Sequence, residues 1–432
     1  MRDKVGLRVR VFLNPAPLNP STPESLNPST PSQMRNGIDT VEISRIEKLL
    51  ADLDEDALHD FFSAQELSDA GSGRGRAQKL AARFAAKEAC CKLFPKEICL
   101  GMIEPYDFSV SRDGYGQPHI IPTERARAVM NRHRVSGISL SMTHTETSAT
   151  AIATVEAAVM DVPWYGKLIF HVLPLRRRVI MENITRVFGE TLPESGIREI
   201  AQGFYGHLVR FLGEFIVLPF LSDAKKEKLI RIEGGEHLVS AEAKGKGVLI
   251  LTGHFGNWEV STVAGIAQFK AYHGRFHFIR RPLKPKWFND FVMRRFRKAG
   301  FGTLDKAGSL DEILDLLEQN EIVVSIFDQF TIRKYGIASE FFGQTAHTFK
   351  SLAVLAQCTG APVIPSSSWR EPDGTHVLRF EAPVTIGTEG RSRDLITSNT
   401  KRFNEALERI ILRHPEQWIW MHKRWKAVPQ EK

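Results

Sequence analysis

The stretch GHFGNWE, residues 253–259, places a histidine and a carboxylate five positions apart, directly behind the apolar run 248–251. On a regular helix that spacing turns two side chains roughly 140° away from each other. His254 and Glu259 can therefore act together only if the two glycines of the stretch bend the backbone. Asn257 is a good N-cap, and Glu259 suits the first turn of a helix that begins there. A histidine on a strand-to-helix loop, backed by a carboxylate, indicates a general base.

A second group of chemically useful residues lies in LAARFAAKEACCK, residues 80–92. Phe84, Glu88 and Lys92 are spaced four residues apart and share one face of a predicted helix. This spacing is compatible with an ordinary helix salt bridge. Asp39 offers an alternative, because an acid at the end of the first strand-like run could meet Glu88 across the domain. Two carboxylates that leave room for water and a substrate phosphate describe a Mg²⁺ site.

Residues 1–33 have a composition unlike the rest of the chain. They repeat LNP and NPSTP and are rich in proline, serine and asparagine. Such a segment cannot bury a core and is predicted to be disordered. Met34 stands just before the first strand-like run, so an upstream start assigned in error is an alternative explanation of this extension.

Two folded domains are predicted to position the reactive residues. Over 34–156 short strands alternate with helices, among them a strong helix over 80–94, which predicts an α+β domain. Over 161–432 two helices, 176–188 and 197–221, precede a series of strand–helix units, which predicts an α/β domain. The strands of these units are GVLILTG, FHFIRR, IVVSIFDQ, APVIPSSSW and HVLRFEAPVTI.

Charge is unevenly distributed between the two domains. Residues 1–156 carry 19 Lys and Arg against 20 Asp and Glu, whereas residues 157–432 carry 39 against 30. A basic excess confined to the second domain indicates an anionic partner. Because no nucleic-acid-binding motif accompanies it, we expect a membrane surface or an acidic protein as partner and no nucleic acid. The four cysteines form no CxxC pair, which favours a reduced, cytoplasmic protein without a structural zinc.

The sequence predicts no transmembrane helix, because every apolar stretch of sufficient length is interrupted by charge. The stretch FYGHLVRFLGEFIVLPFL, residues 204–221, comes nearest to one. It is compatible with an amphipathic helix lying on a membrane surface and equally with an ordinary core helix.

Residues 37–156 resemble the holo-acyl-carrier-protein synthases, the small 4′-phosphopantetheinyl transferases. The resemblance rests on four stretches in the order of the family: GIDTVEISRI, FAAKEACCK, RDGYGQPHI and SLSMTH. It implies coenzyme A as substrate, acyl carrier protein as partner and Mg²⁺ as cofactor. It also implies a homotrimer, because members of that family bind coenzyme A at subunit interfaces.

The resemblance also implies roles for individual residues of the first domain. Asp39 and Glu88 would bind the Mg²⁺ that grips the pyrophosphate of coenzyme A. Lys92 would contact the phosphates and act on the leaving group as a catalytic residue. His144 would lie near the coenzyme, and Arg45 would contact an acidic helix of the carrier protein. A metal that neutralises the pyrophosphate while a base activates the carrier's serine is sound phosphoryl-transfer chemistry.

Residues 164–426 resemble the lipid A biosynthesis acyltransferases, which include lauroyl and myristoyl transferases. The resemblance implies that His254 deprotonates a hydroxyl or amine of an acceptor lipid and that Glu259 orients the imidazole. Arg281 and Arg370 are candidates to bind substrate and to stabilise the oxyanion. The matching stretches are RRRVIMENITRVFG, GVLILTGHFGNWE, FDQ, FFGQTAHT, LAQCTGAPVIP and HPEQWIWMHKRWK.

Two features of the second domain remain open at this point. Asp328 and Gln329 end a buried-looking strand and are candidates for binding or for structure. The resembling family commonly begins with an apolar anchoring helix, whereas WYGKLIFHVL, residues 164–173, is too short to span a bilayer. We therefore expect peripheral attachment to the cytosolic face of the inner membrane.

The leading interpretation is a bifunctional transferase. One domain transfers 4′-phosphopantetheine from coenzyme A to apo acyl carrier protein, and the other transfers an acyl chain from the carrier to a lipid. The alternative is a membrane acyltransferase whose first domain only docks the carrier protein. The metal ligands Asp39 and Glu88 favour the first interpretation, because a docking surface needs none.

Overall fold

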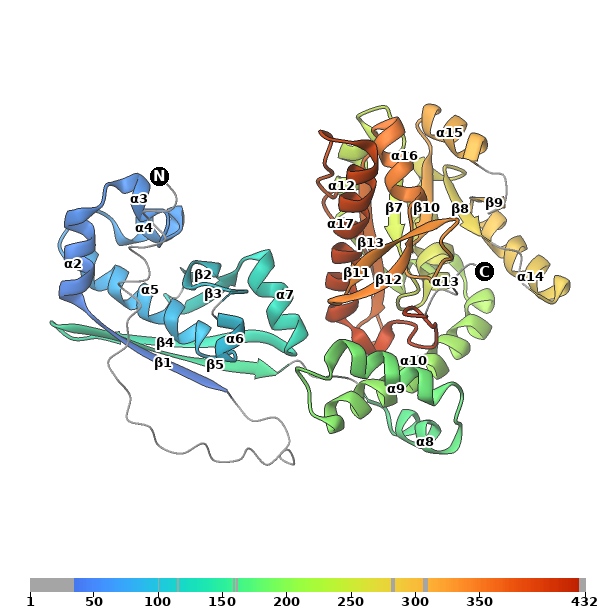
Figure 1. Ribbon diagram of the computed structural model, residues 1–432. Coiled ribbons are helices and arrows are strands. Elements are labelled where there is room, and N and C mark those ends of the chain that lie inside the picture. The colour runs from blue at the N-terminus through green and yellow to red at the C-terminus, as the bar shows by residue number, and fades with distance from the viewer. Residues whose placement is uncertain are drawn as a thin grey trace. The chain divides into compact units, whose positions relative to one another are not determined.

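The protein is described here from a computed structural model (Figure 1). The description covers residues 35–99, 101–114, 116–157, 160, 162–280, 284–305 and 310–426. The expectation of a disordered segment over 1–33 lies outside these residues. The first domain is coloured blue to teal in Figure 1 and the second green to red, and each is described by itself.

The first domain combines antiparallel strands with helices. Its elements are β1 (Asn36–Glu42), α2 (Ile43–Asp52), α3 (Glu55–Leu58), α4 (Ala64–Ala70), α5 (Arg76–Cys91), α6 (Lys96–Cys99), a 3₁₀ turn (Pro105–Asp107), β2 (Phe108–Arg112), β3 (Pro118–Pro122), α7 (Glu124–Arg132), β4 (Val135–His144) and β5 (Ser148–Ala157). The main sheet has the order β1-β5-β4, and β2 pairs with β3 separately. The helix predicted over 80–94 is α5, which begins four residues earlier.

Helix α5 packs on the main sheet and supplies the centre of the first core. Its alanines allow this close packing, and Gly37 of β1 brings the strand still closer. A Cβ at Gly37 would lie 1.9 Å from the carbonyl oxygen of Ala89, so only glycine fits there. The close approach places Asp39, two residues further along β1, beside the C-terminal end of α5.

The second domain is an α/β fold. Its helices are α8 (Trp164–Val172), α9 (Arg177–Phe188), α10 (Glu194–Val217), α11 (Asp223–Lys228), α12 (Gly235–Glu242), α13 (Trp258–Val260), α14 (Lys286–Lys298), α15 (Leu310–Glu318), α16 (Ser351–Thr359) and α17 (Ser392–Arg413). Its strands are β6 (Ile230–Glu233), β7 (Val248–Thr252), β8 (Phe276–Arg280), β9 (Phe301–Asp305), β10 (Ile322–Ile326), β11 (Gly336–Phe341), β12 (Gln344–Phe349), β13 (Val363–Arg370) and β14 (His376–Phe380). Short helical turns are η2 (Leu218–Phe220), η3 (Ser261–Gly265), η4 (Ile266–Gln268), η5 (Lys270–Tyr272) and η6 (Pro415–Gln417).

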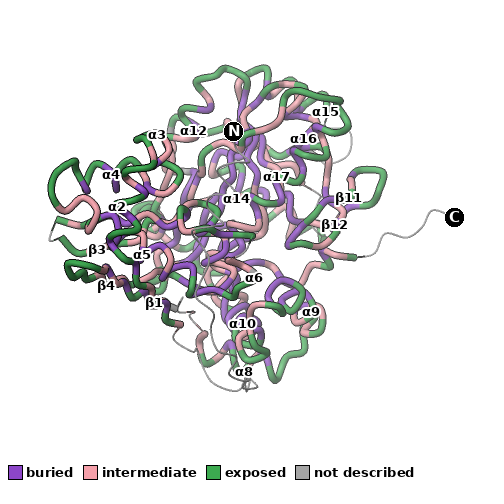
Figure 2. The backbone as a smooth tube through the Cα atoms, turned by 60° about the vertical axis from the view of Figure 1, so that its left-hand side comes forward, coloured by how far each residue is buried: buried purple, intermediate pink, exposed green. Residues whose placement is uncertain are grey.

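Seven of these strands form one sheet in the order β6-β14-β13-β7-β10-β8-β9. The five strands from β13 to β9 run parallel, and β14 is antiparallel to β13. Strand β7 is buried on both faces because Leu249 and Leu251 enter one core and Val248 and Ile250 enter the other. This explains its continuous apolar run. Figure 2 shows the central strands as buried and the outer helices as largely exposed on one side.

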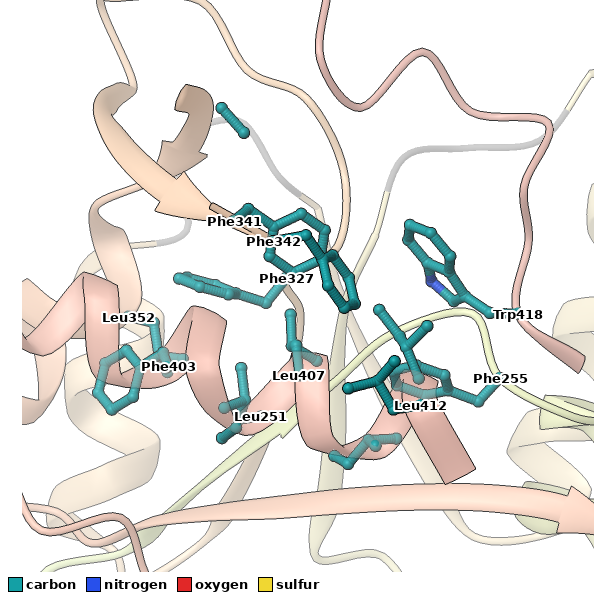
Figure 3. Close-up of a cluster of buried hydrophobic side chains, with 14 of the residues drawn as sticks. Leu251, Phe255, Phe327, Phe341, Phe342, Leu352, Phe403, Leu407, Leu412 and Trp418 are labelled. Atoms are coloured by element: carbon teal, nitrogen blue, oxygen red, sulfur yellow. The ribbon is translucent and has the colours of Figure 1, made fainter. Parts of the chain in front are cut away.

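Helix α17 closes one face of the sheet. Figure 3 shows its Phe403, Leu407 and Leu412 packed among Leu251 of β7 and Phe327, which follows β10. All five side chains are buried. This core holds the ends of β7 and β10 in place and so fixes where the loops after them begin, among them the loop with His254 and the position of Asp328.

Within the described ranges, no helix is both long and apolar enough to cross a bilayer. The stretch 204–221 belongs to α10 and the following turn η2. Its N-terminal part is core, since Phe204 and Tyr205 are buried, whereas Ile216 and Phe220 are exposed. The interpretation as a core helix therefore holds for the first half of the stretch, and the second half presents apolar side chains at the surface.

Candidate active sites

His254 and Asp328 form a hydrogen-bonded pair at the carboxyl end of the parallel sheet. The Nδ1 atom of His254 lies 3.0 Å from Oδ1 of Asp328. The backbone N–H of His254 donates to the other oxygen, Oδ2, at 2.7 Å. Trp418 also donates to Oδ2, from its indole Nε1 at 3.0 Å. The carboxylate therefore fixes the histidine at two points and leaves Nε2 of the imidazole as the reactive nitrogen.

The sheet topology explains why these two residues meet. β7 and β10 are parallel neighbours in the sheet. His254 follows β7 by two residues, and Asp328 follows β10 by two residues. Equivalent positions after parallel neighbours emerge at the same edge, which is where α/β sheets commonly place their sites.

The charges of the pair support a general base. Burial lowers the pKa of His254, but the charge of Asp328 and its hydrogen bond raise it, and the net shift is upward from the ordinary value. Burial raises the pKa of Asp328, but His254 and Trp418 together bring it down to about 2. Asp328 is thus ionised, and His254 is a stronger base than a free histidine.

The loop that presents His254 is built as its sequence predicts. Gly256 has a φ of +51°, and a Cβ there would lie 2.4 Å from the carbonyl oxygen of Ser368. The side chain of Asn257 accepts from the backbone N–H groups of Glu259 and Val260, so it caps α13. These features confirm the predicted bend and N-cap, although α13 passes after one turn into a turn of π-helix, η3.

Glu259 does not orient the imidazole, contrary to expectation. Its side chain is fully buried and forms an ion pair with Arg295 of α14, with Oε1 and Nη2 2.8 Å apart. Burial raises the pKa of Glu259 to about 7, and Arg295 opposes that shift. The first turn of α13 points this carboxylate to the side of the sheet covered by α14, whereas the imidazole turns toward β10. The orienting position is occupied by Asp328.

The expected arginines differ in their placement. Arg370 is buried against Glu214 of α10, to which it donates from Nε and Nη2 at 2.6 Å each. It does not line the cavity beside His254, so the structure gives it a structural ion pair in place of the expected oxyanion role. Glu214 also accepts from Asn257 at 2.7 Å, which connects this pair to the loop that carries His254. Arg281 lies outside the described residues.

An apolar cavity opens beside His254. Its volume is about 240 Å³. It lies on the same face of the sheet as the core that contains Val248 and Ile250. Its walls are mostly aromatic and aliphatic side chains, which include Phe276, Phe278, Val292, Met293 and Phe296. Walls of this kind favour a hydrocarbon chain, because each buried methylene contributes about 0.8 kcal/mol.

The first domain brings Asp39 and Lys92 into direct contact. The ammonium Nζ of Lys92 lies 2.8 Å from Oδ1 of Asp39 and donates to the carbonyl oxygen of Ile38 at 2.9 Å. Glu88 lies one helical turn before Lys92 on α5. Burial raises the pKa of Glu88, the charge of Asp39 raises it further, and Lys92 and Arg45 oppose the shift. The structure therefore brings Asp39, Glu88 and Lys92 together, as expected.

These carboxylates fit a divalent cation. Oε1 of Glu88 is buried and has no hydrogen-bond partner among the described residues, and its like-charged neighbour Asp39 adds repulsion that a cation would relieve. No group of three or more His, Cys, Asp or Glu side chains suited to a metal occurs in the described part of the chain. Proteins nevertheless commonly bind Mg²⁺ with only one or two carboxylates, and substrate phosphates and water then complete its coordination shell.

His144 and Arg45 lie on exposed parts of the first domain. His144 ends β4, where it pairs with Ala149, and Ala149 in turn pairs with Val41 of β1. His144 thus lies two strands across from β1, without a described contact to Glu88. A surface position for both residues is compatible with binding partners outside this domain.

Comparison with known proteins identifies both parts. The profile described as "Bacterial lipid A biosynthesis acyltransferase" matches residues 160–427. The profile described as "4'-phosphopantetheinyl transferase superfamily" matches residues 35–153. The holo-[acyl-carrier-protein] synthase of Treponema denticola is 40% identical over 123 residues, which are 28% of this chain and 95% of that protein. The chain belongs to both families.

Relatives of the acyltransferase domain are more distant. The phosphatidylinositol mannoside acyltransferase of Mycobacterium tuberculosis is 25% identical over 257 residues, which cover 57% of this chain and 77% of that protein. The lipid A biosynthesis palmitoleoyltransferase of Escherichia coli is 26% identical over 263 residues, with 60% and 81% covered. The names of these relatives refer to different lipids, phosphatidylinositol mannoside in one and lipid A in the other. The domain therefore belongs to the family, but the comparisons do not identify the lipid that it acylates.

Two residues of the acyltransferase domain were underestimated from the sequence. The sequence makes Asp328 a candidate for binding or for structure but does not indicate it as the partner of His254, and its position at the end of a strand is the available signal. His422 was named only as part of the stretch HPEQWIWMHKRWK. Its ring centre lies 5.3 Å from that of His254, and burial lowers its pKa, with the charge of His254 a further cause. No local pattern distinguishes it from a packed C-terminal residue.

Proposed function

We propose that the chain is a bifunctional transferase and that both of its reactions use acyl carrier protein, first as acceptor and then as acyl donor. The phosphopantetheinyl transferase domain would transfer 4′-phosphopantetheine from coenzyme A to a serine of the apo carrier. The acyltransferase domain would transfer an acyl chain from the carrier to a lipid. The observation that carries the second activity is the pair His254–Asp328 beside an apolar cavity. Joining both sites in one chain would raise the local concentration of the shared carrier.

In the acyl transfer, Nε2 of His254 would take the proton of a hydroxyl or amine of the acceptor lipid. The freed lone pair attacks the thioester carbonyl and forms a tetrahedral intermediate. This collapses with loss of the phosphopantetheine thiolate, and the imidazolium returns its proton to the thiolate. Asp328 holds the Nδ1–H and stabilises the imidazolium. The apolar cavity would hold the acyl chain and exclude water from the thioester.

In the phosphopantetheine transfer, Asp39 and Glu88 would hold a Mg²⁺ ion at the pyrophosphate of coenzyme A. When bound, the ion neutralises charge on the pyrophosphate. Lys92 would contact the phosphates and stabilise charge on the departing adenosine bisphosphate. The carrier's serine hydroxyl replaces that leaving group, so one phosphodiester bond forms as the pyrophosphate bond breaks. Arg45 and His144 would bind the carrier and the coenzyme.

Reconstitution with the full chain tests both activities. Apo acyl carrier protein, coenzyme A and Mg²⁺ should yield carrier heavier by one phosphopantetheine in intact-protein mass spectrometry. Radiolabelled acyl carrier thioester should yield labelled lipid with a bacterial membrane lipid extract. Tight binding of apo carrier with no gain in mass would show a docking domain in place of the proposed transferase.

The pH dependence of acyl transfer tests the role of Asp328. Because only the neutral imidazole accepts a proton, kcat/KM should rise with pH through the pKa of His254, which Asp328 raises above its ordinary value. In Asp328→Asn the charge is removed while burial continues to lower that pKa. The rising limb of the profile should therefore move to lower pH, and the plateau should fall roughly 10–10²-fold as the imidazole loses its orientation. An unshifted limb in Asp328→Asn would show that Asp328 does not act on the base.

The acyltransferase domain exposes a large apolar surface suited to a membrane. It includes Trp164 of α8 at 74%, Ile216 of α10 at 64%, Phe220 of η2 at 84% and Trp287 of α14 at 71%. The helices that carry them are neighbours, because α8 packs on α10 and aromatic rings of α10 and α14 are in contact. Basic residues stand close to these positions in the sequence, among them Lys167, Lys225 and Lys286. We propose peripheral attachment to the cytosolic face of the inner membrane through it.

Vesicle sedimentation tests this attachment. The double variant Ile216→Asp/Phe220→Asp should lower binding of the full chain to phosphatidylglycerol vesicles by at least roughly 10-fold, since each buried large apolar side chain contributes about 1.5–3 kcal/mol. The matched control is Val239→Asp/Ile332→Asp, which adds the same charge at exposed apolar residues of other elements. Equal loss in both variants would show a charge effect and contradict the assigned surface.

The first domain leaves apolar side chains exposed on its main sheet. Ile38 of β1 is 55% exposed and Ile152 of β5, its pairing partner, is 38% exposed. We propose that copies of the chain associate through this face as a closed trimer, as the resemblance implies. Light scattering should give three times the chain mass for the full chain and one chain mass for Ile38→Glu/Ile152→Glu. A monomeric parent would contradict the trimer.

A further inference from the structure

A second hollow of the acyltransferase domain is strongly basic. It has a volume of about 350 Å³ and lies between α9 and the C-terminal segment. Its walls carry four cationic side chains, Arg178, Arg186, Lys423 and Lys426, and one carboxylate, Glu182. Basic groups that converge on a concave surface favour an anionic ligand, and paired arginine and lysine groups suit phosphate in particular.

Most of this positive charge is not neutralised by the protein. Lys423 and Lys426 are exposed, and within the described residues neither forms an ion pair. Arg186 donates to the amide oxygen of Gln344 at 2.8 Å and stacks 5.7 Å from the ring centre of Trp425, so it too keeps its charge. Of these four cations, Arg178 alone has a carboxylate partner among the described residues, in its surface pair with Glu182. Three cations therefore remain for a ligand.

The segment that carries the lysines is held firmly. Asn183 of α9 donates from Nδ2 to the carbonyl oxygens of Trp420 and His422 at 2.8 and 2.7 Å. Arg424 is fully buried and donates to the hydroxyl of Thr348 at 2.6 Å. These contacts on either side of Lys423 fix the backbone that carries it before any ligand binds, so binding costs only the ordering of the lysine side chain.

The hollow lies within reach of the catalytic base. His422 faces His254 with 5.3 Å between ring centres, and Lys423 is the next residue. Lys426 follows His422 by four residues, so their Cα atoms are at most about 14 Å apart. Thirteen bonds separate the sulfur of a phosphopantetheine arm from its phosphorus, so at about 1.2 Å per bond the arm spans roughly 16 Å when extended. A thioester at His254 would place the phosphate of the arm at these lysines.

We propose that this basic hollow binds the phosphate of the acyl donor's phosphopantetheine arm. The proposal rests on the proposed function, in which the donor is a phosphopantetheine thioester. The donor is favoured over a lipid headgroup because the exposed large apolar side chains of the domain lie on other elements, and none of them lines the hollow. The acyl chain would then enter the apolar cavity while the phosphate anchors the opposite end of the donor.

Two synthetic ligands that differ only in the phosphate test this proposal. S-dodecyl-pantetheine 4′-phosphate and S-dodecyl-pantetheine would each displace a fluorescent dodecanoyl probe from the cavity of the full chain, a readout that the first domain does not affect. The phosphorylated ligand should displace the probe from the parent at a concentration lower by roughly 10-fold or more, the scale of a charge-assisted hydrogen bond. In Lys423→Ala/Lys426→Ala that advantage should disappear, with no change for the unphosphorylated ligand.

The matched control is Lys226→Ala/Lys401→Ala, which removes two lysines from surface ion pairs elsewhere in the domain. It should keep the full advantage of the phosphate. An equal effect of both ligands on the parent, or an advantage that survives in the Lys423/Lys426 variant, would overturn the proposal. Loss of phosphatidylglycerol vesicle binding in that variant, without loss of the phosphate advantage, would assign the hollow to a lipid headgroup. Failure of the proposed function would instead leave the parent unable to transfer an acyl chain from the carrier thioester to lipid, whatever the two ligands do in the displacement assay.

Discussion

Replacing His254 by alanine is expected to lower acyl transfer from acyl carrier protein to lipid by roughly 10²–10⁴-fold, the usual contribution of a positioned base. The reason is geometric, because Asp328 binds Nδ1 and the adjacent backbone N–H and so leaves Nε2 directed to substrate. Initial rates of radiolabel transfer into a membrane lipid extract, with parent and variant side by side, measure the effect. Near-parent transfer by His254→Ala would show that the histidine is structural.

Glu259 supplies the comparison within the same motif. Glu259→Gln should cost much less activity than His254→Ala, because the carboxylate pairs with Arg295 and makes no described contact with the imidazole. The substitution should also affect stability in a pH-dependent way. Burial raises the pKa of Glu259 to about 7, so its ionisation opposes folding increasingly as pH rises from its unfolded pKa toward 7. The difference in unfolding free energy between parent and Glu259→Gln should therefore change across this range and level off above it.

Replacing Glu88 by glutamine is expected to abolish phosphopantetheine transfer to within the detection limit of intact-protein mass spectrometry. An amide oxygen is a poor ligand for Mg²⁺, and the buried Oε1 has no other described partner that could compensate. Glu104→Gln is the matched control, because its carboxylate is exposed and its ion-pair partner in the described part of the chain is Arg125, at 3.5 Å. Full activity of Glu88→Gln would contradict the metal assignment, and loss of activity in both variants would indicate a general effect of lost charge.

Much of the acyltransferase fold could be predicted because its strands are buried on both faces. Such strands read as continuous apolar runs, as over 248–251. The helix predicted over 176–188 is α9, because its apolar residues repeat at helical spacing and face one core. The helix that begins after Asn257 could be predicted, but its change after three residues into a turn of π-helix could not, because no local pattern in the sequence indicates it.

The base of the acyltransferase site could be found from the sequence, but its partner could not be chosen correctly. Local sequence indicates His254, because it follows a strand-like apolar run and is flanked by two glycines and by the N-cap residue Asn257. Asp328 is 74 residues away, and the choice between it and Glu259 depends on which strand lies next to β7. Strand order is a tertiary property that local spacing does not contain. The first domain shows the opposite case, because Glu88 and Lys92 share one helix and only Asp39 needed a long-range contact.

The central claim is that one chain carries two transferases with separate sites, and a crossed assay tests it most directly. Parent, His254→Ala and Glu88→Gln would each be assayed for carrier mass gain with coenzyme A and Mg²⁺ and for labelled acyl transfer from carrier to lipid. We predict that the parent shows both activities, that His254→Ala loses only acyl transfer, and that Glu88→Gln loses only phosphopantetheine transfer. A parent that lacks either activity, or a single substitution that removes both in a folded protein, would contradict the account.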